Sequence, residues 1–164
     1  MKPNNLNIIV AMTADGVIGL NGKIPWYISD DLKNFKRITT GNGGNVVIMG
    51  KSTYESIGKP LVNRVNIVVS KTLKERPFRN SNIIVEPSLT DALNFAEQLD
   101  KDIFLIGGRQ IYTQGLPIVD TMYITQIKKN YQGNIYFPKF NKDNWSVEKI
   151  QEHPEFELFL YKRK

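Results

Sequence analysis

The sequence contains no cysteine and a single histidine, His153. Without cysteine no disulfide can form, so nothing in the composition indicates an oxidising compartment. A zinc site is not expected either, because such sites use several cysteine or histidine ligands. A Ser-His-Asp triad would depend on His153 alone, and no Gly-x-Ser-x-Gly turn accompanies it. We therefore predict no bound metal and interpret His153 as a loop residue.

Long apolar runs are also absent. Uninterrupted stretches such as Ile8 to Met12 are far shorter than the roughly 20 residues that span a bilayer. The chain opens with Met-Lys-Pro-Asn-Asn, which lacks the apolar core of a signal peptide. We expect a cytoplasmic protein that does not bind membranes.

Charge of one sign is in excess without being concentrated. The net charge of +6 and the isoelectric point of about 9.4 favour anionic partners. Apart from the C-terminal Lys162-Arg163-Lys164, the basic residues are scattered, and we find no basic helix or aromatic-lined basic stripe typical of nucleic-acid binding. We expect a phosphate-bearing small molecule and no nucleic acid.

The chain has 164 residues, enough for one globular domain, which we place at residues 1–164. Short runs rich in Val and Ile lack the alternation of a one-sided strand, which is typical of strands covered on both faces. They alternate with helical segments until the last third, where strand-like segments follow one another. The pattern predicts an α/β fold with a predominantly parallel, mixed central sheet of about eight strands, ending in antiparallel C-terminal strands and flanked by about four helices. The expected strands are 6–12, 46–49, 65–69, 82–85, 102–106, 121–127, 145–150 and 156–162, and the expected helices are 30–40, 52–57, 89–99 and 109–116, the third capped by Ser88 or Thr90.

Two adjacent acids, Asp30 and Asp31, stand in the first turn of the first predicted helix. Helical spacing puts Asp30 on the side of Lys33 and Asn34, which we predict to be solvated, and Asp31 on the apolar side of Phe35. A carboxylate at the head of an apolar face is partly desolvated, which raises its pKa and suits it to proton chemistry. On spacing alone, both acids could equally serve only the helix dipole.

Glycines follow two of the predicted strands, at Gly50 and at Gly107 with Gly108. Glycine lets backbone amides approach a diphosphate, and a helix N-terminus favours its negative charge. Neither stretch matches a dinucleotide fingerprint or a Walker loop, so a tight turn remains the alternative for each. Lys51 and Lys71 lie just past strand ends, where each either pairs with a further phosphate or is simply solvated.

Taken in order, these segments resemble the dihydrofolate reductase family over essentially the whole chain. The resemblance implies the family's α/β fold and an NADPH-dependent oxidoreductase that reduces dihydrofolate to tetrahydrofolate. Such an enzyme supplies one-carbon metabolism, is a target of antifolates and is a monomer by family default. The motifs are Gly16-Val17-Ile18-Gly19, Ile24-Pro25-Trp26, Asp31-Leu32-x-x-Phe35-Lys36, Val47-Ile48-Met49-Gly50-Lys51-x-Thr53-Tyr54-Glu55-Ser56-Ile57-Gly58, Pro60-Leu61-x-x-Arg64, Asn66-Ile67-Val68-Val69-Ser70, Ile106-Gly107-Gly108-x-x-Ile111-Tyr112 and Tyr123-Ile124-Thr125.

For the substrate, the resemblance implies that Asp31, hydrogen-bonded to Thr125, holds the amidine-like edge of the pterin. Arg64 would clamp the glutamate carboxylate of the substrate with its planar fork. The implied catalytic residues are Asp31, Trp26, Thr125 and Tyr112. The implied substrate-binding residues are Ile9, Val10, Asp31, Leu32, Phe35, Lys36, Ile57, Lys59, Leu61, Arg64, Ile106 and Thr125.

For NADPH, the resemblance implies a site along the carboxyl-terminal edge of the sheet, with a cis peptide between Gly107 and Gly108. Lys51, Ser70 and Lys71 would read the 2′-phosphate. The implied cofactor-binding residues are Ala11, Val17, Ile18, Gly19, Leu20, Asn21, Gly22, Lys23, Gly50, Lys51, Ser52, Thr53, Ser70, Lys71, Gly107, Gly108, Arg109, Gln110, Ile111 and Tyr112.

The implied reaction is hydride transfer from nicotinamide C4 to pterin C6, with protonation of N5. Asp31 would lie too far along the pterin to deliver that proton, so we expect it to fix and polarise the ring while a water donates. The loop over residues 14–28 is expected to close over the nicotinamide. Asn134 stands where many bacterial members carry Asp to hold this loop shut, so we expect a less favoured closed state.

Two other functions stay open on the sequence. One is a related pyrimidine or pterin reductase on the same fold, such as the reductase of riboflavin synthesis, against which Asp31, Phe35 and Arg64 argue. The other is a nucleotide- or nucleic-acid-binding module without catalysis, suggested by the net charge. A cleft without Asp31, or a continuous basic face, would favour that module.

Overall fold

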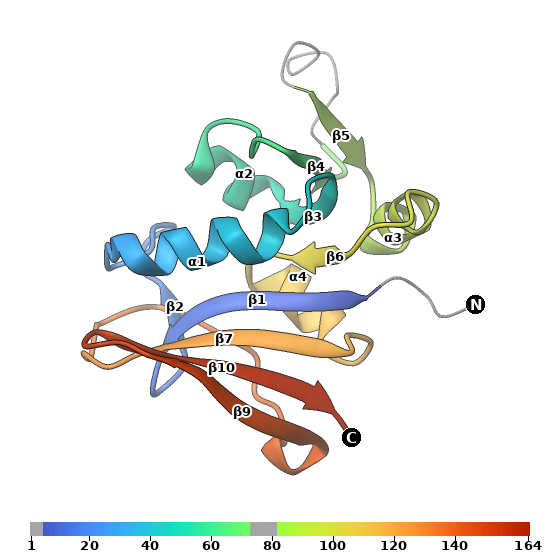
Figure 1. The fold of residues 1–164 in the computed structure, drawn as a ribbon. Coiled ribbons are helices and arrows are strands. Elements are labelled where there is room, and N and C mark those ends of the chain that lie inside the picture. Colours follow the sequence, from blue (N-terminus) through green and yellow to red (C-terminus); the bar gives the residue numbers. More distant parts are fainter. Residues whose placement is uncertain (1–4, 73–81) are drawn as a thin grey trace.

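A computed structural model describes residues 5–72 and 82–164. The start of the chain, residues 1–4, where we considered a signal peptide, lies outside the described residues. Strands and helices alternate up to the last third of the chain, as predicted (Figure 1). The elements are β1 (Leu6–Thr13), β2 (Val17–Gly19), α1 (Ser29–Thr40), β3 (Asn45–Gly50), α2 (Lys51–Ile57), β4 (Arg64–Val69), β5 (Ile83–Glu86), α3 (Leu89–Glu97), β6 (Ile103–Leu105), α4 (Arg109–Gly115), β7 (Thr121–Ile127), β8 (Ile135–Tyr136), the short 3-10 helix η2 (Lys142–Asn144), β9 (Trp145–Glu152) and β10 (Phe156–Arg163).

The central sheet has eight strands in the order β5-β4-β3-β6-β1-β7-β10-β9. The first six are parallel to one another, and β10 is antiparallel to both of its neighbours, β7 and β9. The predicted α/β fold, with a mostly parallel sheet ending in antiparallel strands, is thus confirmed. One detail was wrong: β7, which we grouped with the antiparallel strands, pairs in parallel with β1 and is antiparallel only to β10.

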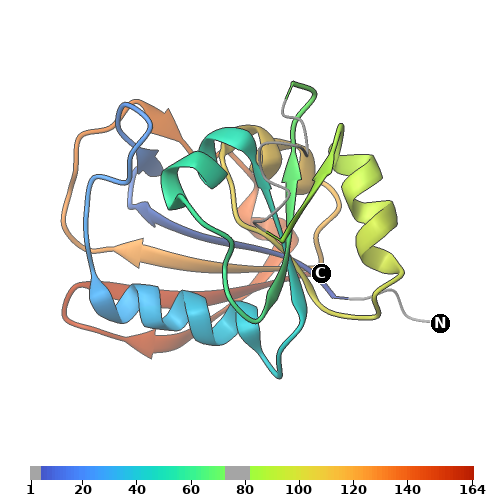
Figure 2. The same ribbon diagram turned by 90° about the horizontal axis from the view of Figure 1, so that it is seen from above.

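Helices cover both faces of the sheet, with α1 on one side and α4 on the other (Figure 2). Residues Val46 to Met49 of β3 are therefore fully buried, although they do not alternate with polar residues. Their side chains divide between two clusters, one under α3 and α4 and the other under α1 and α2. The uninterrupted apolar runs in the sequence reflect this double cover.

The helix α3 begins as its sequence predicts. Ser88 is the N-cap, and its hydroxyl accepts a hydrogen bond from the backbone N–H of Asp91 at 3.0 Å. Leu89, Ala92 and Ala96 form its buried side at helical spacing.

A second, two-stranded sheet joins β2 to β8, which the sequence analysis did not predict. Beyond β2, Asn21 and Gly22 both have positive φ and form a two-residue turn, closed by two backbone hydrogen bonds between Leu20 and Lys23. In the described part of the chain, no helix is long and apolar enough to cross a membrane.

Candidate active site

The chain reverses its direction across the sheet at β1. The connection through α1 leads from β1 to β3 on one side, whereas α4 leads from β6 across β1 to β7 on the other. In open α/β sheets, ligands bind beyond the carboxyl ends of the strands at such a reversal. Most of the candidate residues follow these strand ends or lie on α1 or α2.

Asp31 faces the sheet from the first turn of α1. The Thr125 hydroxyl on β7 donates a hydrogen bond to Asp31 Oδ1 at 2.7 Å, and Thr125 itself is buried. Burial raises the pKa of Asp31 above its usual value, whereas the Thr125 hydrogen bond opposes this rise. The two residues thus meet as expected, and the predicted direction of the pKa shift is confirmed.

Tyr112 lies at the base of the same region. Its hydroxyl donates to the carbonyl oxygen of Ile9 at 2.9 Å, so two of the expected polar groups bond to each other. Burial raises the pKa of Tyr112, which keeps its hydroxyl protonated. The Ile106 backbone N–H donates to Ile48, and its side chain is buried, as is that of Val10.

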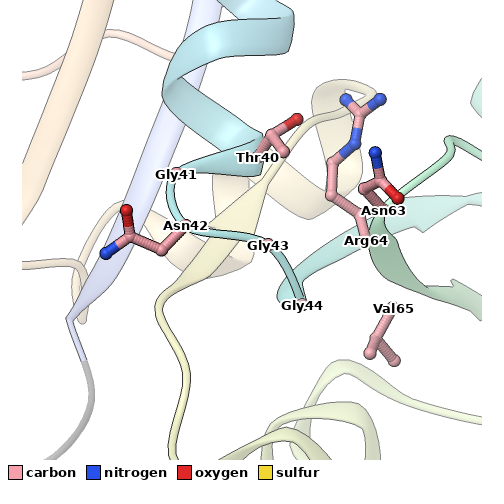
Figure 3. A pocket seen from close by; sticks show the side chains of 8 residues that line it. All are labelled: Thr40, Gly41, Asn42, Gly43, Gly44, Asn63, Arg64 and Val65. Carbon is pink, nitrogen blue, oxygen red and sulfur yellow. The ribbon is translucent and has the colours of Figure 1, made fainter.

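Arg64 stands at the far end of α1. Its Nη1 donates to the Thr39 hydroxyl at 3.0 Å and its Nε to the Val62 carbonyl at 2.9 Å, while Nη2 has no hydrogen bond within the described residues. Thr39 in turn donates to the Phe35 carbonyl, so the guanidinium is fixed relative to α1. Partial burial lowers the pKa of Arg64. Beside it, a pocket of about 560 Å³ opens over Thr40 and the glycine turn at residues 41–44 (Figure 3).

Several apolar side chains on α1 and on the segments before α1 and β4 are exposed to solvent. Leu32 is 49% exposed on α1, and Tyr27 and Val62 are more exposed still. An exposed apolar side chain such as Leu32 beside a half-buried carboxylate is typical of a site for a flat, partly apolar ligand. Of the other predicted substrate residues, Phe35, Ile57 and Leu61 are partly buried, and Lys36 and Lys59 are exposed.

Gly50, Gly107 and Gly108 meet at the ends of β3 and β6 and form what we call the glycine cradle. The Gly50 N–H donates to the Gly107 carbonyl at 2.8 Å, and the Gly107–Gly108 peptide is cis, as the resemblance implied. Thr53 faces the cradle, because its hydroxyl lies 3.5 Å from where a Cβ of Gly108 would stand. Gly50 and Gly108 are the N-caps of α2 and α4, and neither helix has a side-chain cap. The N-termini of two helices thus meet at a surface without side chains.

The residues expected to surround the cradle differ in their exposure to solvent. Arg109 and Gln110 are exposed, Ile111 is buried, and the Arg109 Nη1 donates to the Tyr136 carbonyl at 2.7 Å. The Lys51 Nζ lies 3.8 Å from the Glu55 carboxylate, one turn along α2. The three residues expected to bind the 2′-phosphate, Lys51, Ser70 and Lys71, thus lie at the ends of the neighbouring strands β3 and β4. Ser52, next to Lys51, is exposed.

The predicted loop over residues 14–28 contains β2 and packs against the segment before β8. Asn134 Oδ1 accepts from the Asn21 backbone N–H, and its Nδ2 donates to Asn21 Oδ1, both at 3.0 Å. The Trp26 ring lies 5.4 Å from that of Tyr131. Of the predicted cofactor-binding residues on β1 and in this loop, Val17 and Gly19 are buried, Ala11 and Ile18 partly buried, and Leu20, Asn21, Gly22 and Lys23 exposed.

Three contacts were not predicted from the sequence. Asn34, which we placed on a solvated face, is only 9% exposed, because its amide donates to Gln151 on β9. His153 does lie in a loop, but it also contacts Asp30. Buried Asn66 bonds both the N–H and the carbonyl of Leu61 and so shapes the segment before Arg64. A lone amide within an apolar strand was the signal for Asn66.

Comparison with known proteins agrees with this geometry. The family model described as dihydrofolate reductase matches residues 5–162. A dihydrofolate reductase of Haemophilus influenzae is 41% identical over 87% of this chain and 84% of its own length. One from Bacillus subtilis is 36% identical over 97% of this chain and 95% of its own, and one from Staphylococcus aureus is 35% identical over 87% and 83%.

Proposed function

The chain belongs to the dihydrofolate reductase family, and we propose that Asp31, Thr125 and Arg64 hold its substrate while the glycine cradle holds its cofactor. It is an NADPH-dependent oxidoreductase that reduces dihydrofolate to tetrahydrofolate. The observation that carries the assignment of the site is the half-buried carboxylate of Asp31, oriented by Thr125 beside exposed apolar side chains.

On the substrate side, Asp31 uses one oxygen for Thr125 and has no hydrogen bond to its Oδ2 within the described residues. That oxygen accepts from the amidine-like edge of the pterin. Leu32, Phe35 and the residues Ile57 and Leu61 enclose the ring and the aminobenzoyl group. The free Nη2 of Arg64 binds the glutamate carboxylate at the other end, and Thr39 keeps the guanidinium in place.

The residues at the glycine cradle fit NADPH. A diphosphate needs backbone N–H groups and no competing side chain, and both helix N-termini there lack a side-chain cap. Thr53, Ser70, Lys51 and Lys71 supply hydroxyl and cationic partners for the phosphates. When bound, NADPH supplies the hydride that passes from nicotinamide C4 to pterin C6.

Protonation of N5 is a separate task. Asp31 contacts the opposite edge of the pterin, so it fixes and polarises the ring and a water donates the proton. The segment over residues 14–28, held to Asn134 by Asn21, covers the nicotinamide and keeps bulk water out.

We further propose that residues 1–164 form one domain that acts as a monomer in the cytoplasm and binds no nucleic acid. These proposals rest on the family resemblance and on the scattered distribution of the basic residues. Sedimentation of the purified protein with and without NADPH tests the monomer, since a dimer at micromolar concentration would contradict it.

Equilibrium titrations of Asp31→Asn and Gly108→Ala test the two halves of the site. A Cβ at Gly108 makes only an ordinary contact with Thr53 in the free protein, and φ there is −87°, so the variant is expected to fold. Gly108→Ala places a methyl group in the cradle. It should weaken the binding of NADPH at least about tenfold, a loss of roughly 1.4 kcal/mol, and leave the binding of dihydrofolate unchanged. Asp31→Asn should weaken the binding of dihydrofolate and leave the binding of NADPH unchanged. Equal losses for both ligands in either variant would contradict the assignment.

A further inference from the structure

His153, the single histidine, is held rigidly although it lies in the turn between β9 and β10. Its ring stacks on Phe156, with centroids 4.3 Å apart and an interplanar angle of 10°. The backbone N–H of Glu155 donates to Nδ1 at 3.0 Å, and only 17% of the side chain is exposed. The ring is thus fixed on two sides, by the buried Phe156 and by the Glu155 N–H.

The third contact of the ring reaches helix α1. His153 Nε2 lies 2.9 Å from Asp30 Oδ2. Because the Glu155 N–H occupies Nδ1, that nitrogen must be an acceptor, and the proton of the neutral ring is therefore on Nε2. The imidazole thus donates to the Asp30 carboxylate, and this hydrogen bond holds the pKa of Asp30 below its usual value.

This contact falls in the first turn of α1, beside the Asp31–Thr125 hydrogen bond. Its N-cap is Ile28, which offers no side-chain cap to the first turn. Figures 1 and 2 both place the β9–β10 turn beside this end of α1. One turn later, Asn34 donates to Gln151 on β9 at 2.6 Å, so two hydrogen bonds join the helix to the same hairpin. Asp31 follows Asp30 directly, so the position of the first turn also determines the hydrogen bond between Asp31 and Thr125.

We propose that His153 is a positioning residue for dihydrofolate reduction, which fixes the first turn of α1 through Asp30 so that Asp31 presents its carboxylate to the pterin. The inference rests on the proposed role of Asp31. It predicts that breaking the contact loosens substrate binding and orientation, while the glycine cradle and its cofactor are unaffected.

The charged groups around the ring are few. Asp30 faces it from α1, with Lys33 lying 3.7 Å beyond Asp30. In the hairpin, Glu155 is exposed and Glu152 is paired with Lys128 and Lys149.

The test compares steady-state kinetics of four variants over a range of pH. His153→Phe keeps the stacking on Phe156 and removes both nitrogens, and Asp30→Ala removes the acceptor. Asp30→Asn keeps an acceptor oxygen for Nε2 without the charge. Glu148→Ala is the matched control, because Glu148 is exposed on β9 and makes no hydrogen bond or ion pair to α1 within the described residues.

The expected result for His153→Phe and Asp30→Ala is a kcat/KM for dihydrofolate lower by about 3- to 30-fold, with an unchanged affinity for NADPH. Asp30→Asn should lose less than Asp30→Ala, because it keeps an acceptor for Nε2, although a neutral acceptor is roughly half as strong as a charged one. Recovery in Asp30→Asn relative to Asp30→Ala is the readout that distinguishes a hydrogen bond from His153 Nε2 from a merely structural role.

Unchanged kcat/KM in His153→Phe and Asp30→Ala would overturn the inference, as would equal losses in Asp30→Asn and Asp30→Ala. Should His153→Phe fail to fold, the comparison of the two Asp30 variants decides alone. Asp31→Asn is measured in parallel. If that variant keeps full activity, the proposed role of Asp31 fails; if it is inactive while the others are normal, only the role of His153 fails.

Discussion

At the scale of single residues, the carboxyl group of Asp31 is subject to two opposing influences. Burial on the inner side of α1 disfavours its charge, and the Thr125 hydroxyl restores part of what solvent would supply. A residue kept charged in a partly dry cleft is suited to bind a cationic or amidine-like edge, but it does not stabilise the empty protein.

Asp31→Asn should therefore make the unliganded protein more stable at neutral pH. The pKa of Asp31 is raised in the folded state, so its contribution to stability is present below the ordinary aspartate pKa of 3.8 and is lost as pH rises through the folded pKa. The amide avoids that loss and still accepts from Thr125. Thermal unfolding should show a higher Tm for the variant at pH 7, and the difference should vanish toward pH 3. A lower Tm at pH 7 would contradict this account.

Arg64→Lys separates the two ends of the substrate site. The ammonium group keeps the charge but not the fork that reaches Thr39, Val62 and a carboxylate together. We expect KM for dihydrofolate to rise about tenfold, because a lysine cannot be held by Thr39 and Val62 while it donates to the carboxylate, with little change in kcat. A reduced pterin without the glutamate should be turned over equally by both proteins. A loss with that truncated substrate as well would place Arg64 in some other role.

At the scale of elements, the site depends on contacts between segments far apart in the chain. The glycine cradle joins the ends of β3 and β6, and the reciprocal amide pair of Asn21 and Asn134 joins the turn after β2 to the segment before β8. Both contacts use neutral groups. The strength of the Asn21–Asn134 pair can be changed by a side-chain substitution, whereas the cradle contact joins two backbone groups.

Asn134→Asp tests how far this pair controls the loop. The carboxylate still accepts from the Asn21 N–H, and a charged acceptor is roughly twice as strong as a neutral one. The Asn21 amide must then turn to present its NH₂ group. We expect cofactor release, followed by stopped-flow competition, to slow by about three- to tenfold for a gain of roughly 1 kcal/mol. Identical release rates would show that the pair does not limit opening.

At the scale of the whole molecule, the sequence predicts the layers better than the contacts between them. Uninterrupted apolar runs indicate strands covered on both faces, and helical spacing correctly turned Asp31 inward and Asp30 outward. The same spacing failed for Asn34, because its burial depends on Gln151, 117 residues away. It could not detect β2 and β8 either, since such short strands carry no periodicity of their own. Local pattern determines elements, whereas partners distant in sequence determine the site.

The core itself offers a test of packing. A Cβ on Gly115 of α4 would overlap the side chain of Leu105, which is fully buried on β6. Gly115→Ala should lower the free energy of unfolding by about 1–3 kcal/mol through overpacking. The exposed neighbour Gln114 provides the control, because Gln114→Ala leaves the core unchanged. Chemical denaturation measures both, and equal stabilities would mean that α4 moves away from the sheet without cost.

The most direct test of the central claim is the absorbance of NADPH at 340 nm, followed with and without dihydrofolate for the unmodified protein and for folded Asp31→Asn. The account predicts NADPH loss that requires dihydrofolate and that falls on the order of 100-fold or more in the variant. Consumption of NADPH at the same rate by both proteins, or no turnover by the unmodified folded protein, would contradict it.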